Sequence, residues 1–82
     1  TWTAEWSPDG SRIGYSILGP GWGELRIIRR DGQPVASLAR AGTTLNGAVW
    51  TPDGKRLFFH WKRGQDGGVQ SVNPEGLDLR HE

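Results

Sequence analysis

Residue types that commonly carry catalysis are present in this chain, but their spacing does not assemble a reactive centre. His60 and His81 have no cysteine and no second histidine at the spacing of metal ligands. None of the serines follows the Gly-x-Ser-x-Gly pattern that exposes an acyl-transfer nucleophile. They are Ser7, Ser11, Ser16, Ser37 and Ser71. The sequence therefore predicts a protein that is not an enzyme, with no catalytic, metal-binding or cofactor-binding residue.

Two tryptophans, one of them beside basic residues, are the strongest candidates for binding a partner. Trp22 lies in the glycine-rich segment 19–23, where no core requires it. Trp61 ends an apolar segment and is followed by Lys62 and Arg63. Exposed aromatic side chains beside basic groups are typical of protein-interaction hot spots, and they also suit stacking on a sugar. In the alternative interpretation, Trp22 folds back over its own sheet and covers an edge.

The charge of the chain does not favour a nucleic acid or a membrane as partner. Ten basic and nine acidic residues leave a formal net charge of +1, whereas nucleic-acid-binding domains usually show a clear basic excess. Arg26, Arg29 and Arg30 cluster on one segment, where such charges usually discourage pairing of strand edges; a phosphate site is the alternative. No apolar run approaches the roughly 20 residues of a membrane-spanning helix.

The elements that position these residues follow from an internal repeat. The segment Trp6-Ser7-Pro8-Asp9-Gly10 recurs as Trp50-Thr51-Pro52-Asp53-Gly54, a shift of 44 residues. The same shift pairs Ile13 with Leu57 and Tyr15 with Phe59. Because they stand between proline and glycine, Asp9 and Asp53 are predicted to cap turns rather than to catalyse. Trp6 and Trp50, as aromatic residues that recur with the repeat, are predicted to lie in the core between the repeat units.

Each repeat unit reads as four short strands separated by turns. The predicted strands of the first unit are 4–6, 12–18, 24–29 and 34–39; those of the second are 48–50, 56–61, 68–72 and a last strand near 77–80. Four antiparallel strands in about 40–45 residues is the period of a propeller blade. We therefore predict an all-β fold, a β-propeller segment of two four-stranded antiparallel blades, residues 1–44 and 45–82. A single eight-stranded sandwich or barrel is the alternative.

In such a blade, the connection between the second and third strands shares one face with the link to the next blade. That face is expected to gather Trp22, Trp61, Lys62 and Arg63 with the linker residues 43–46.

The motifs Trp6-Ser7-Pro8-Asp9-Gly10 and Trp50-Thr51-Pro52-Asp53-Gly54 resemble the WD-repeat-like repeats of TolB-like β-propellers. So does the run from Glu24 to the pair Asp31-Gly32, whereas the later turn Asn73-Pro74-Glu75-Gly76 departs from the usual Asp-Gly type. The resemblance implies a scaffold or protein-interaction module in a periplasmic or exported setting. Its alternatives are part of the propeller that gates a prolyl-oligopeptidase-like serine peptidase, and a carbohydrate-binding propeller.

Two blades by themselves are expected to leave two apolar faces bare, because a blade of a propeller is packed on both faces by its neighbours. The expected partners are therefore further blades, supplied either by the rest of a longer chain or by self-association into a ring. A protein or peptide ligand at the loop face is a further expected partner.

Overall fold

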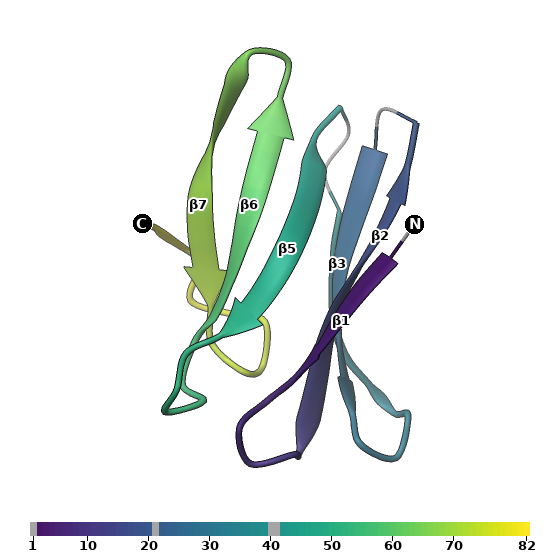
Figure 1. The fold of residues 1–82 in the computed structure, drawn as a ribbon, viewed down its shortest axis with the longest axis vertical. Coiled ribbons are helices and arrows are strands. Elements are labelled where there is room, and N and C mark those ends of the chain that lie inside the picture. Colours follow the sequence, from purple (N-terminus) through teal and green to yellow (C-terminus); the bar gives the residue numbers. More distant parts are fainter. Residues whose placement is uncertain (1, 21, 40–41) are drawn as a thin grey trace.

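The computed structural model describes residues 2–20, 22–39 and 42–82, which form eight strands and no helix (Figure 1). The strands make two separate four-stranded antiparallel sheets, in the orders β1-β2-β3-β4 and β5-β6-β7-β8. The first sheet contains β1 (Trp2–Trp6), β2 (Arg12–Gly19), β3 (Trp22–Arg29) and β4 (Pro34–Ala39). The second contains β5 (Thr44–Trp50), β6 (Leu57–Arg63), β7 (Asp66–Val72) and β8 (Arg80–His81). The prediction of an all-β chain with two such sheets is confirmed.

The pairing of the strands follows the 44-residue shift. Trp6 pairs with Ile13 in the first sheet, and the equivalent Trp50 pairs with Leu57 in the second. Across the next strand pair, Ile13 lies opposite Ile28 and Leu57 lies opposite Val72. The first half of β5 departs from the shift, because its register is irregular between Asn46 and Val49. Elsewhere in these pairings, equivalent residues have equivalent places in the two sheets.

The last strand is shorter and later than predicted. The sequence suggests a strand near residues 77–80, whereas β8 covers only Arg80–His81. The cause is the turn before it, where the Asn73 Oδ1 atom accepts hydrogen bonds from the backbone N–H groups of Glu75 and Leu77. Asp78 then takes a positive φ of 55°. These conformations delay the return to extended backbone.

The recurring Pro-Asp-Gly turns are capped as predicted. The Asp9 carboxylate accepts hydrogen bonds from the Ser11 backbone N–H at 3.0 Å and from the Ser7 hydroxyl at 2.7 Å. The Asp53 carboxylate accepts the same pair of bonds from Lys55 N–H and the Thr51 hydroxyl. Both aspartates are therefore structural residues of the turns.

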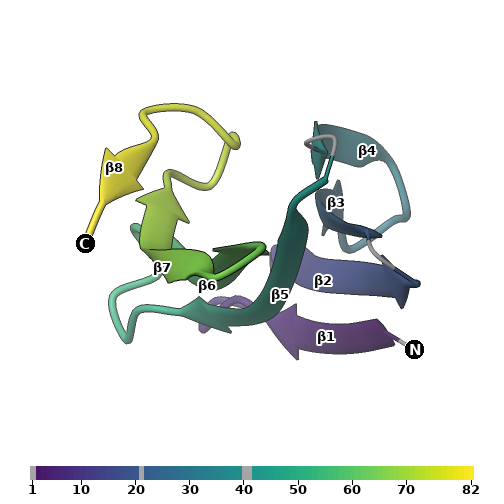
Figure 2. The same cartoon turned by 90° about the horizontal axis from the view of Figure 1, so that it is seen from above.

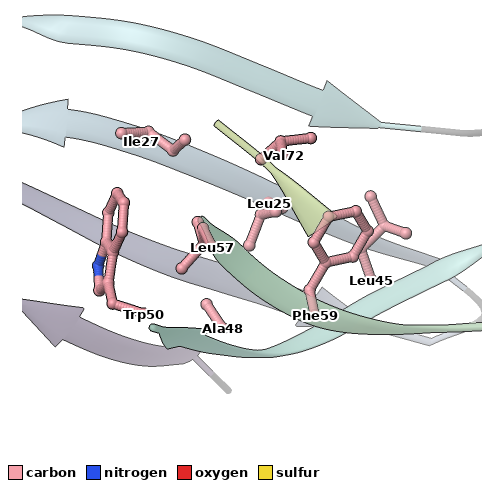
Figure 3. Close-up of a cluster of buried hydrophobic side chains, with 8 residues drawn as sticks. All are labelled: Leu25, Ile27, Leu45, Ala48, Trp50, Leu57, Phe59 and Val72. Atoms are coloured by element: carbon pink, nitrogen blue, oxygen red, sulfur yellow. The ribbon is translucent and has the colours of Figure 1, made fainter. Parts of the chain in front are cut away.

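The hydrophobic core lies between the two sheets (Figure 3). Leu25 and Ile27 project into it from β3, and the second sheet contributes Leu45, Ala48, Trp50, Leu57, Phe59 and Val72. In the view of Figure 2, the two sheets stand side by side; β1 and β5 are neighbours, and β4 and β8 lie at outer corners. One face of each sheet is thus committed to the core.

Candidate functional site

The principal candidate site is the face of the first sheet that points away from the core. It presents the side chains of Ala4, Trp6, Ile13, Tyr15, Ile17 and Ile28 around a shallow concavity of about 540 Å³. We call these six residues the open face. They share one side of the sheet because successive side chains of a strand point to opposite sides, as the alternation of Ile13, Tyr15 and Ile17 predicts.

Trp6 is the clearest sign that the open face lacks a cover. Its side chain is 57% exposed, whereas the equivalent Trp50 is only 6% exposed. The prediction that both tryptophans lie in the core between repeat units is therefore confirmed for Trp50, whereas Trp6 lies on a face that the described chain leaves bare. The physical reason is that Trp50 packs against the first sheet, while no part of the described chain lies over Trp6.

The other positions of the open face show the same contrast. Ile13, Tyr15 and Ile28 correspond to Leu57, Phe59 and Val72 in the second sheet, which are 0%, 1% and 0% exposed. The residue types on the open face are thus those that the second sheet buries completely. A contiguous apolar surface of this kind is typical of an interaction site.

A charged pair borders the open face on the side of β3 and β4. The Arg26 Nε atom lies 2.7 Å from the Glu24 Oε1 atom, which also accepts a hydrogen bond from the Ser37 hydroxyl. These hydrogen bonds, that from Arg26 first, lower the pKa of Glu24; the bond to Glu24 raises the pKa of Arg26. Because Arg26 is already neutralised by Glu24, it is poorly placed to serve a phosphate site with Arg29 and Arg30, whose side chains are exposed.

The candidate residues from the sequence are distributed over different surfaces. Trp22 begins β3 and is 45% exposed, and its indole lies over its cross-strand neighbour Gly19, where a Cβ would overlap with the ring. Trp61 is half-buried and packs against the core cluster. Lys62 and Arg63 are exposed, and the alternation of β6 turns Lys62 to the side opposite Trp61.

The linker residues expected beside these tryptophans are part of the packing between the sheets. Thr43 is 3% exposed and Leu45 is completely buried. The Asn46 side chain accepts a hydrogen bond from the Ser16 hydroxyl at 3.3 Å, which joins β5 to β2. The linker therefore holds the sheets together.

The histidines of the described residues lie apart from any cluster of potential metal ligands. Among the described residues, no group of three or more His, Cys, Asp or Glu side chains could hold a metal ion. The His81 Nδ1 atom lies 3.1 Å from the Gln70 side-chain amide nitrogen, which ties it to the neighbouring strand. His60 is exposed on β6. Within the described part of the chain, no helix is long and apolar enough to cross a membrane.

No protein-family model, no curated protein and no solved structure matches this chain. The case for its function therefore rests on the geometry of the two sheets and on the open face.

The structure also reveals residues that the sequence alone did not single out. Gly14 and Ser16 are buried on the side of β2 that faces the second sheet, and the lack of a side chain at Gly14 lets Leu57 approach closely. The signal in the sequence is their alternation with Ile13, Tyr15 and Ile17, which places small residues on one side of β2 and large apolar ones on the other.

Proposed function

We propose that this chain is a non-catalytic segment of a β-propeller that serves as a scaffold, and that its open face docks against a further four-stranded sheet. In this proposal the two sheets are neighbouring blades. The resemblance of the Trp-Ser-Pro-Asp-Gly turns to those of TolB-like propellers supports it, and extends it to a periplasmic or exported setting.

The observation that carries the proposal is the way the two sheets stack. The face of the second sheet that contains Trp50, Leu57 and Phe59 covers the opposite face of the first sheet, which contains Gly14 and Leu25. The contact is therefore heterologous: two different surfaces meet, and each sheet retains one surface for another neighbour. Heterologous contacts of this kind generate rings or open arrays, and a propeller is such a ring.

The arrangement of the sheets agrees with this interpretation. In Figure 2, β1 and β5, the first strands of the two sheets, lie next to each other, and the last strands β4 and β8 lie at outer corners. Blades that radiate from a common axis have their first strands close together in this way. The core between the sheets is the contact that would recur around the ring.

The test is to add a third sheet in the register of the repeat. A second copy of residues 1–44 is joined ahead of residue 1 of the chain. Thr44 of the copy is then followed by Thr1, which is the repeat equivalent of Leu45, the residue that follows Thr44 in the chain itself. The added sheet presents Gly14 and Leu25 to the open face. We expect Trp6 of the original chain to become protected from acrylamide quenching.

We also expect the denaturant dependence of the unfolding free energy to increase, because this slope scales with the surface exposed on unfolding. The matched control is the same fusion with Trp6→Lys in the original chain, which should leave the added sheet undocked. An added sheet that unfolds separately, with Trp6 still fully quenched, would show that the open face is not a docking surface for a sheet.

A further inference from the structure

We infer that the sheet that docks on the open face presents a glycine or another very small residue opposite Ile13, and that this partner is not a second copy of the chain. The inference rests on the proposed function and names the partner's chemistry. Its basis is the contact between the two sheets. There, the residues of the second sheet that are equivalent to the open face pack against the first sheet, and this contact shows what such residues require of the surface that they cover.

Gly14 provides the space for the contact that the chain already makes. A Cβ atom at Gly14 would lie 2.9 Å from the Leu57 Cδ2 atom and 3.5 Å from the Trp50 indole nitrogen. The first distance is closer than carbon atoms pack in proteins, so Leu57 fits against the first sheet because position 14 has no side chain.

Trp50 adds a polar requirement to this steric one. Its indole N–H donates a 3.0 Å hydrogen bond to the backbone carbonyl oxygen of Glu5 in β1. A buried indole N–H needs such an acceptor. The covered surface thus supplies a gap for Leu57 and a carbonyl oxygen for Trp50.

The open face makes the same demands through equivalent residues. Ile13 stands at the position of Leu57, and Trp6 stands at the position of Trp50, with the same strand pairing in each sheet. The partner sheet must therefore leave a gap opposite Ile13 and direct a backbone carbonyl oxygen toward the Trp6 N–H.

The outer face of the second sheet, which a second copy would offer, lacks this gap. The residue equivalent to Gly14 is Phe58, and the residue equivalent to Ser16 is His60. A benzyl group thus occupies the place where Ile13 would enter. This face departs from the expectation of two bare apolar faces, since it carries the exposed His60 beside Phe58 and the exposed Val49.

A charged network fixes the rest of that outer face. The Arg56 guanidinium donates to the Ser71 hydroxyl at 2.8 Å, and it lies 3.0 Å from the Asp78 carboxylate. Ser71 occupies the position of the core residue Ile27 in the first sheet. The second sheet therefore offers a benzyl ring and a serine bound to an arginine where the first offers a glycine and an isoleucine.

The test is a mixing experiment with an engineered probe. The probe is the same chain with Phe58→Gly, His60→Ser and Ser71→Ile, which give its second sheet the residues of the first. It also carries Trp6→Lys, which blocks its own open face. The control probe carries Trp6→Lys alone. Each is mixed with the wild-type chain, and the mass of the complex is measured by size-exclusion chromatography with light scattering.

We expect a one-to-one complex of about twice 9.1 kDa with the engineered probe. The control probe should bind at least about tenfold more weakly, since forcing a large side chain into a packed contact commonly costs that much affinity. Complex formation that is equally strong with both probes would overturn the inference and identify a second copy as a suitable partner. If both probes are folded and neither forms a complex, the inference that a gap opposite Ile13 governs docking is overturned.

Far-UV circular dichroism and thermal unfolding establish that each probe is folded. If Phe58→Gly does not fold, Phe58→Ala replaces it. Alanine removes the benzyl group but keeps a Cβ atom, so we then expect binding that is weaker than to glycine and stronger than to the control probe, and equal binding to both probes would still overturn the inference. The result is separable from that of the three-sheet fusion. A fusion that docks while the two probes bind equally would retain the proposed function and reject the inference about the partner.

Discussion

Trp6 and Trp50 form a natural matched pair, because they occupy the same position of the repeat but differ in exposure, at 57% and 6%. We expect Trp50→Ala to lower the free energy of unfolding by about 3–5 kcal/mol, the usual cost of deleting a buried large aromatic side chain. Loss of the 3.0 Å hydrogen bond to the Glu5 carbonyl contributes about 1 kcal/mol of this. We expect Trp6→Ala to cost about 0.5 kcal/mol or less, as for most surface substitutions.

Urea unfolding followed by far-UV circular dichroism measures both effects, since this signal reports mainly on the backbone and each variant is referred to its own folded and unfolded baselines. A small domain commonly has only about 5–15 kcal/mol of stability, so the Trp50→Ala chain should be largely unfolded under mild denaturation. Trp50→Phe separates the ring from its N–H and should lose only a part of the effect. Equal losses for Trp6→Ala and Trp50→Ala would refute the assignment of the open face, because the reasoning requires that only Trp50 is covered.

Three further predictions concern single residues. Gly14→Ala should destabilise the chain by about 1–3 kcal/mol in urea unfolding, because its Cβ would meet Leu57; an unchanged midpoint would argue against the close approach of the sheets. Hydrogen bonds from Ser11, the backbone N–H first, and from Ser7 lower the Asp9 pKa to about 2. The ionised Asp9 carboxylate therefore stabilises the folded chain above about pH 4, and this stabilisation is lost as the pH falls toward 2. Asp9→Asn should flatten this part of the acid unfolding curve, and identical curves for the variant and the wild-type chain would contradict the reasoning. Gly19→Ala should displace the Trp22 indole and increase its quenching by acrylamide, with Trp22→Phe identifying the signal, and unaltered quenching would count against the stacked arrangement.

Much of the local structure could be predicted from the recurrence of short motifs. The turns at Asp9 and Asp53 follow from residue types whose conformations are restricted, and the structure shows the expected capping bonds. The alternation of Ile13, Tyr15 and Ile17 fixed which side chains share a face. These features depend on neighbours in the chain, so a single sequence contains the information.

The candidate site was harder to predict because it depends on how the sheets meet. For Trp22 the sequence left two interpretations open, an exposed binding residue and a ring folded back over its own sheet, and in the structure its ring covers Gly19 across the hairpin. Trp61 was placed on a loop surface, yet it packs against the core cluster. In both cases the deciding contact comes from another strand, and the spacing of residues along one strand does not contain it.

By itself, the sequence determined the two repeat units, their strands and the capped turns, because these follow from local conformational preferences and from the alternation of side chains. Only the tertiary structure decided which face of each sheet is covered. Trp6 and Trp50 are the same residue type in the same motif, and their different exposure arises because the second sheet lies over just one side of the first. The absence of a side chain at Gly14 allows that contact, and Phe58 at the equivalent position changes the surface that the second sheet offers to its own neighbour.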